Sequence, residues 1–195
     1  MDQESAGAGG SGEVNDRLGG RCAAQPPRHE PAPDRGPIVQ PRIITQPPFE
    51  VVGLEIETAP KSPEIPALWG RFAGRITEIA DAPEPQIGYG VIARFDRERT
   101  RPCYLSGVAV RPSGRAPEGM TRTEIPGGTY AVFYSSLSVL AATFDHIFGV
   151  WLQGALYRLA SGPYYERYGE TFEPENPSSL VTIHLPVVAV AGDGT

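Results

Sequence analysis

The sequence predicts an α+β domain built from a duplicated β-α-β-β module, with two antiparallel-rich half-sheets, one helix on each, and a central groove between them. Three observations lead to this prediction. Several segments have strand-like composition and alternation, two longer segments repeat their apolar residues at helical spacing, and the whole order recurs after about 80 residues. A chain of 195 residues suits one such domain with some additional chain.

The first module begins with a long strand over residues 42–58. A Pro-Pro pair at positions 47–48 interrupts this strand, and because proline has no N–H to donate, the pair predicts a bulge or an edge. A helix is expected over residues 62–80, where Ser62 and Pro63 suit its cap and first turn. Its apolar face is formed by Ile65, Leu68, Trp69, Phe72, Ile76 and Ile79. Two strands complete the module, over residues 87–95 and 103–111.

The second module repeats this order. Residues 120–136 read as strand, with a turn at the Gly-Gly pair 127–128. A second helix is expected within residues 139–159. One face of this helix carries Leu140, Phe144, Ile147, Phe148, Trp151 and Leu152. Two strands close the chain, over residues 164–172 and 179–188.

The composition divides the chain into three parts. Residues 1–41 contain seven Gly and six Pro, and the first aromatic residue of the chain is Phe49. Such a segment buries too little apolar surface to offset its ordering entropy, so we expect a disordered tail. Residues 42–188 form the predicted folded domain, and residues 189–195 are expected to be a frayed end.

The charge balance argues against a nucleic-acid partner. The net charge is −6 and the pI is about 5.1. A surface that binds nucleic acid needs clustered Lys and Arg to displace counterions from phosphate, and the sequence contains no such cluster. The start of the chain lacks the apolar core of a signal peptide, and no segment reaches the roughly 18 consecutive apolar residues of a membrane span. We therefore expect a cytoplasmic protein that does not bind membranes.

Cysteine and histidine usage predicts neither a disulfide nor a metal site. The two cysteines, Cys22 and Cys103, lie in regions of very different composition. The three histidines, His29, His146 and His184, are scattered without ligand-like spacing. We expect no cofactor.

The stretch GPYYERYGETFEP, from Gly162 to Pro174, carries four aromatic rings and places Glu166 between Tyr164 and Tyr168. Alternate side chains of a strand share one face, so these three side chains are expected to point the same way. A carboxylate among rings is either a solvated edge residue or the anionic floor of a ligand pocket. The pattern alone leaves both interpretations open.

The ordered series of segments resembles the GyrI-like small-molecule-binding family, whose module is also the effector-binding domain of AraC- and MerR-type multidrug-responsive regulators. The matching pieces are IPALWGRF, GYGV, YLSGVAV, IPGGTYAVF, GPYYERY and IHLPV, within residues 42–188. No DNA-binding segment accompanies them, so we expect a stand-alone form. Two positions depart from the family pattern. Phe144 replaces an early Trp of the second helix, and Gln153 replaces the Pro that follows the Trp-Leu pair.

The resemblance implies an aromatic pocket between the two modules, with an acidic residue that pairs with cationic drugs or dyes. The match of YYERY to the Glu-containing strand of the family assigns that acidic role to Glu166. Matching positions make Trp69, Tyr89, Tyr104, Phe133 and Tyr168 the expected pocket walls.

Three functions are compatible with this resemblance. The leading one is binding of hydrophobic, often cationic aromatic small molecules, for sequestration or sensing of xenobiotics. The second is hydrolysis of cyclopropane-bearing DNA alkylators, in which Glu166 would assist ring opening while water attacks the cyclopropane carbon. The third is a protective interaction with DNA gyrase. We expect the first, and hence a binding protein rather than an enzyme.

Overall fold

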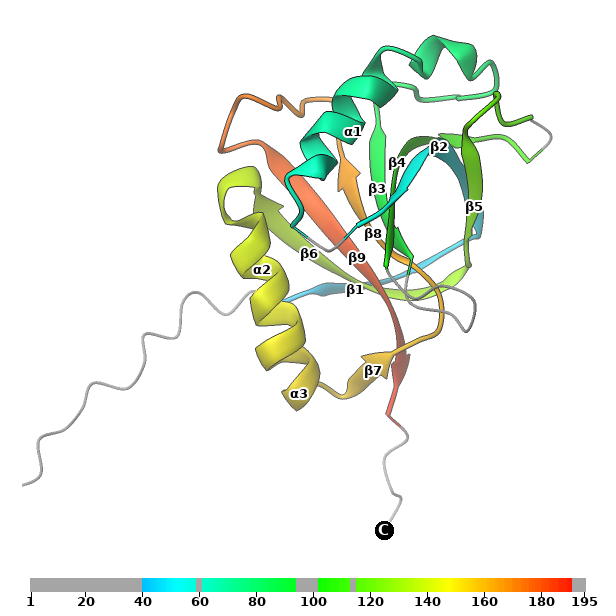
Figure 1. Cartoon of the computed structure of the whole chain (residues 1–195). Helices are drawn as coiled ribbons and strands as arrows, with labels where there is room; N and C mark the ends of the chain where they lie inside the picture. Colours follow the sequence, from blue (N-terminus) through cyan, green and yellow to red (C-terminus); the bar gives the residue numbers. More distant parts are fainter. Residues whose placement is uncertain (1–39, 59–60, 94–101, 113–114, 191–195) are drawn as a thin grey trace, which may run out of the picture. The chain divides into compact units, whose positions relative to one another are not determined.

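A computed structural model describes residues 40–58, 61–93, 102–112 and 115–190, all within the unit Pro37–Thr195. The described part is an α+β domain in which helical segments cover a single curled antiparallel sheet (Figure 1). The predicted fold class is therefore confirmed. The strands are β1 (Arg42–Gln46), β2 (Phe49–Glu57), β3 (Gly88–Ala93), β4 (Cys103–Val110), β5 (Thr121–Ile125), β6 (Gly128–Ser136), β7 (Tyr157–Leu159), β8 (Tyr164–Tyr168) and β9 (Leu180–Ala189).

The sheet has the strand order β1-β6-β9-β8-β3-β4-β2-β5, and β7 pairs with β9 beside this path. The inner face of the sheet holds one hydrophobic core. Ile44 from one end of the strand order and Ile125 from the other pack into the same cluster, together with Tyr130 and Tyr165 from strands between them. Residues at opposite ends of a flat sheet would not meet, so this shared core records how strongly the sheet curls (Figure 1).

The Pro-Pro pair at 47–48 separates β1 from β2, as the sequence predicts. The two strands then pair with different partners: Arg42–Gln46 lie along β6, whereas Phe49–Glu57 lie between β4 and β5. Two successive residues without an N–H cannot continue a hydrogen-bonded ladder, so the chain leaves one end of the strand order and joins the other.

The two predicted half-sheets are β2-β4-β3 and β8-β9-β6, and the pairing of β3 with β8 joins them into one sheet. Each half carries one helical segment on the same outer face, over its own strands (Figure 1). The duplication of the sequence itself stays a prediction.

The first helix, α1 (Glu64–Ala73), is shorter than the predicted span of 62–80 and is followed by the 3₁₀ turn η1 (Ile76–Glu78). It ends at Ala73, and the backbone N–H of Arg75 then donates to the Phe72 carbonyl at 2.9 Å. At its start, the Ser62 hydroxyl accepts a hydrogen bond from the Glu64 backbone N–H at 3.2 Å, but the N-cap position is Pro63, one residue later than the sequence predicts, and it has no side-chain cap hydrogen bond.

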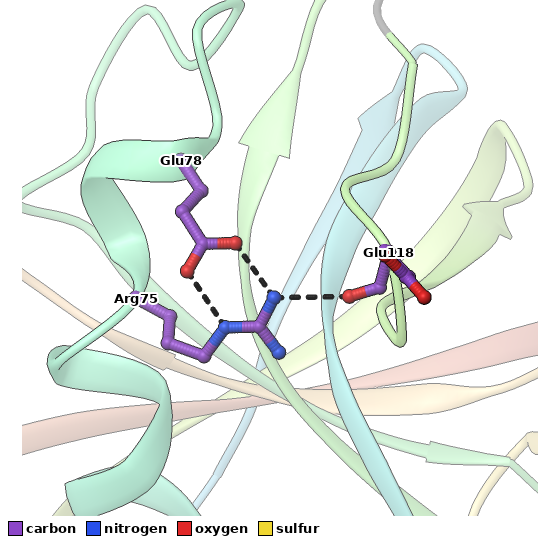
Figure 2. A network of polar contacts seen from close by, with 3 residues as sticks. All are labelled: Arg75, Glu78 and Glu118. Atoms are coloured by element: carbon purple, nitrogen blue, oxygen red, sulfur yellow. Dashed lines mark hydrogen bonds and ion pairs between the residues drawn. The ribbon is translucent and has the colours of Figure 1, made fainter.

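An arginine fixes the chain that follows α1. The Arg75 guanidinium donates two hydrogen bonds to the Glu78 carboxylate, at 2.7 and 2.6 Å, and a third to the Glu118 backbone carbonyl at 2.9 Å (Figure 2). The bidentate pair holds η1, and the third bond ties η1 to the connection between β4 and β5. The sequence pattern did not reveal this contact, because its partners are 43 residues apart.

The second helical segment is continuous but irregular. The 3₁₀ turn η2 (Leu137–Val139) leads into α2 (Leu140–His146), a π-helical stretch η3 (Ile147–Trp151) and a last turn, α3 (Leu152–Gly154). The apolar face predicted for this helix packs against Ala131, Ile183 and Leu185 of the sheet. The helix stops before residue 159, because residues 157–159 form β7 and pair with β9 instead.

Some predictions fall on residues that the structure does not describe. The expected tail lies almost wholly in residues 1–39, and most of the expected frayed end lies in 191–195. Of the described helices, none has the length and apolar character needed to cross a membrane.

Candidate functional site

A cavity of about 960 Å³ lies between the two helical segments, over the outer face of the sheet. One wall comes from α1, the opposite wall from α2 and η3, and the floor from β3, β4 and β8. Aromatic rings dominate its surface: Trp69, Phe72, Tyr104, Phe144, Phe148, Tyr164, Tyr168 and Phe172. The volume suits a drug-sized organic molecule, since such pockets span about 300–1,000 Å³.

The rings of the cavity support one another by edge contacts. The Trp69 ring meets Tyr168 edge-on at a centroid distance of 5.1 Å, and Tyr168 in turn meets Phe172 at 4.7 Å. On the opposite side, Phe148 packs against Tyr164 at 5.6 Å. Interlocked rings have few free rotamers, so these walls are largely formed before a ligand arrives.

Glu166 lies on the floor of this cavity, on β8. Its side chain is 7% exposed and points to the same face as Tyr164 and Tyr168, as the alternation of a strand predicts. The Tyr104 and Tyr168 hydroxyls both donate hydrogen bonds to Oε2 of Glu166, each at 2.7 Å. The Trp69 indole N–H donates to the Tyr104 hydroxyl at 3.1 Å. These contacts fix the carboxyl group between the two halves of the sheet.

Burial raises the pKa of Glu166, and the hydrogen bonds from Tyr168 and Tyr104 oppose this rise only in part. Burial likewise raises the pKa of both tyrosines, and the neighbouring Glu166 carboxylate adds to the effect. In the described part of the chain, no Lys, Arg or His hydrogen bonds or ion-pairs with Glu166. The cavity floor therefore holds an acidic group that lacks a positive partner.

Two glycines of β3 leave space for side chains of the site: Gly90 for the Glu166 carboxyl group and the Tyr104 hydroxyl, and Gly88 for the Trp69 ring. Neither was among the predicted site residues. Gly90 pairs with Glu166 across β3 and β8, and a Cβ atom on Gly90 would collide with the Tyr104 hydroxyl and lie 2.7 Å from Oε2 of Glu166. A Cβ on Gly88 would lie 3.0 Å from the Trp69 ring. The signal was present in GYGV, because glycines at alternate strand positions leave one face of the strand bare.

Four of the six residues predicted to form the pocket line the cavity: Trp69, Tyr104, Glu166 and Tyr168. They come from α1, β4 and β8, which the β3–β8 pairing brings together.

The other two, Tyr89 and Phe133, do not line this cavity. Tyr89 alternates with Gly88 and Gly90, so it points into the core on the inner face of the sheet, where its ring lies 5.3 Å from Phe49. Phe133 is on the cavity side of the sheet, but the second helical segment covers it, and its ring meets Trp151 at 5.1 Å.

The rim of the cavity carries charged side chains. Lys61 precedes α1 and forms an ion pair with Asp145 of α2, with 2.7 Å between Nζ and Oδ1. Glu175, in the connection between β8 and β9, also lines the rim. Within the described ranges, no group of three or more His, Cys, Asp or Glu side chains is placed to hold a metal ion.

A cavity of this size and lining defines the class of domains that bind small organic molecules. Residues 39–187 match the model of the GyrI-like small molecule binding domain, and the chain belongs to this family. The resemblance carried by the sequence motifs is thereby confirmed.

Known relatives agree with this assignment. The transcriptional regulator BrlR of Pseudomonas aeruginosa is 32% identical over 149 residues, which cover 75% of this chain and 54% of that protein. The chain thus spans about half the length of this relative. Among solved structures, SAV2435 bound to tetraphenylphosphonium has a TM-score of 0.59 at 15% identity, covering 76% of this chain and 94% of that one. The EcmrR C-terminal domain has a TM-score of 0.56 at 16% identity, covering 78% and 99%. Both share the fold.

Proposed function

We propose that this chain binds hydrophobic aromatic molecules carrying a positive charge, and that it thereby sequesters or senses xenobiotics. The observation that carries the proposal is the Glu166 carboxyl group, buried on the floor of an aromatic cavity without a cationic partner. A ligand cation is the missing partner. Tetraphenylphosphonium, the molecule bound to SAV2435, has this chemistry and supports the proposal.

The energetics favour a cation over a neutral ligand of the same shape. Removing a carboxylate from water is costly, and the raised pKa of Glu166 records that cost. A cation placed beside the carboxylate recovers part of it through a charge–charge interaction that water screens poorly inside the cavity. Ring faces add about 0.5–2 kcal/mol each when they contact a cation.

Apolar contact is expected to supply most of the affinity. Burial of ligand surface contributes roughly 25 cal/mol per Å², so the rings of Trp69 and Tyr168 would account for more binding energy than the charge. In this scheme the carboxylate gives selectivity, whereas the rings give affinity. Because apolar contact is non-directional, ligands of several shapes are expected to bind. The Tyr104 hydroxyl holds the carboxylate in place.

A matched pair of ligands tests this proposal. Methyltriphenylphosphonium is a cation, and triphenylphosphine oxide is a neutral molecule of similar size. We expect Glu166→Gln to lower the affinity for the cation at least tenfold, about 1.4 kcal/mol, and to change the affinity for the neutral ligand less than twofold. Displacement of a fluorescent dye at pH 8 measures both affinities.

Glu124→Gln is the matched control, because Glu124 is an exposed carboxylate of β5 at the far end of the strand order. It removes the same charge and should leave the affinities for both ligands unchanged. An equal loss of affinity for the two ligands in Glu166→Gln would assign Glu166 a structural role. Absence of binding of either ligand to the unaltered protein would refute the proposal itself. The hydrolase and gyrase alternatives stay predictions, and no contact described above favours either.

A further inference from the structure

The ion pair between Lys61 and Asp145 joins the two walls of the cavity at its rim. Lys61 belongs to the segment before α1, whereas Asp145 belongs to α2, and the two residues are 84 positions apart in the chain. Both line the cavity. Lys61 is also the sole lysine of the sequence, so its ammonium group is the one primary ammonium side chain available to any carboxylate of the protein. Its Nζ atom marks a position at which an ammonium group binds Asp145.

This ion pair is exposed and easily broken. The Lys61 and Asp145 side chains are 46% and 71% exposed, and exposed pairs contribute little because water and salt screen them. A competing cation would therefore displace the Lys61 side chain at small expense and leave the Asp145 carboxylate at the rim.

We propose that Asp145 is a second cation subsite, and that the preferred ligands are aromatic cations bearing a second positive charge on a flexible arm. This inference rests on the proposed function of Glu166. The aromatic body would lie over the rings near Glu166, and the arm would reach Asp145 in place of the Lys61 ammonium. Phe144, which directly precedes Asp145 on α2, and Tyr164 of β8 also line the cavity and supply apolar surface for the arm.

Ethidium and propidium test this proposal directly. The two dyes share one phenanthridinium ring system, and propidium adds a quaternary ammonium on a propyl arm. We expect the unaltered protein to bind propidium more tightly than ethidium. Lys61→Met should raise the affinity for propidium further, up to about fivefold, since that is the upper end of what an exposed ion pair contributes. Ethidium should change less than twofold in the same variant.

Asp145→Asn removes the subsite and should abolish the preference for propidium. The control is Glu175→Gln, which neutralises the other rim carboxylate and should keep that preference. Arg71→Met removes an exposed positive charge of α1 that is not on the cavity and should leave the ratio of the two affinities unchanged. Fluorescence titration at low salt gives every Kd.

The dye titrations distinguish failure of the Asp145 subsite from failure of the function proposed for Glu166. Equal responses of the two dyes to Lys61→Met and Asp145→Asn overturn the second subsite, while the function proposed for Glu166 stands if both dyes lose affinity in Glu166→Gln. Loss of the preference in Glu175→Gln instead of Asp145→Asn places the second charge elsewhere and also overturns the assignment. If neither dye binds the unaltered protein, both proposals fail.

Discussion

Gly90→Ala is the substitution that tests the geometry of the site most sharply. The added Cβ would collide with the Tyr104 hydroxyl and stand 2.7 Å from Oε2 of Glu166, so the smallest possible side chain cannot coexist with the observed hydrogen bonds. Tyr104 must move, and its bonds to Trp69 and Glu166 break. Steric overpacking costs about 1–3 kcal/mol, and a broken hydrogen bond about 1 kcal/mol, or more when one partner is charged. We expect a loss of stability of about 2–4 kcal/mol.

Urea unfolding measures this loss, and a double-mutant cycle assigns it. In a Tyr104→Phe background the hydroxyl is already absent, so Gly90→Ala should cost at least about 1 kcal/mol less than in the unaltered protein. Cation binding should fall in the same variants, because the carboxyl group loses its positioning bond.

Gly70→Ala is the matched control. Gly70 lies in α1, and a Cβ there would meet no atom within 4 Å. Alanine in a helix is favoured over glycine by about 0.5–1 kcal/mol, so this variant should be as stable as the unaltered protein or more stable. A cost below about 0.5 kcal/mol for Gly90→Ala, or strict additivity with Tyr104→Phe, would refute the steric argument.

Three further outcomes follow from the charges. The folded pKa of Glu166 is raised, so the residue costs stability progressively as the pH rises above its lower, unfolded pKa. Glu166→Gln should therefore be more stable than the unaltered protein at pH 7.5, and urea unfolding should show the gap closing towards pH 4. Burial, with the nearby Arg167 charge, lowers the pKa of His184 to about 4; the unfolded chain then gains a proton first, and about 3 kcal/mol of stability should be lost between pH 6.5 and 4, a loss absent in unfolding curves of His184→Gln. Arg75→Met should speed hydrogen exchange in residues 115–120 with little effect on global unfolding, whereas a global effect would contradict a local role.

The hydrogen bonds of His184 are consistent with a neutral ring. The Tyr165 hydroxyl donates to Gln46 at 2.8 Å and lies 3.1 Å from Nδ1 of His184, so it can accept the Nδ1 proton. The Thr182 hydroxyl, 3.0 Å from Nε2, then donates to the unprotonated nitrogen. Both ring nitrogens are satisfied without a charge, which agrees with the direction of the pKa shift.

Local periodicity predicts part of the site well. The alternation of β8 places Tyr164, Glu166 and Tyr168 on one face, and this depends on a repeat of two residues that the sequence displays directly. The helical spacing of α1 places Trp69 on the apolar face of that helix, whereas its place in the cavity wall was expected from the family resemblance. Neither inference requires knowledge of distant contacts.

Other parts of the site depend on contacts that the sequence does not display. Tyr89 lies on the inner face because of how β3 registers against β8, and that register pairs Gly90 with Glu166. Phe133 lies on the cavity face of the sheet, but the second helical segment covers it. The position of a helix on a sheet depends on contacts between residues far apart in the sequence. The three-residue strand β7 is too short to show a period and is fixed by its pairing with β9.

The pairing of β3 with β8 gives the site a dependence on both halves of the chain. Trp69, Gly90 and Tyr104 come from the first half, whereas Glu166 and Tyr168 come from the second. A fragment containing one half would keep the carboxylate or its orienting hydroxyl from β4, but not both. The proposed binding of a cation at Glu166 would therefore oppose separation of the halves. A protein divided between β4 and β5 would then report reassembly of its two fragments through the return of ligand binding.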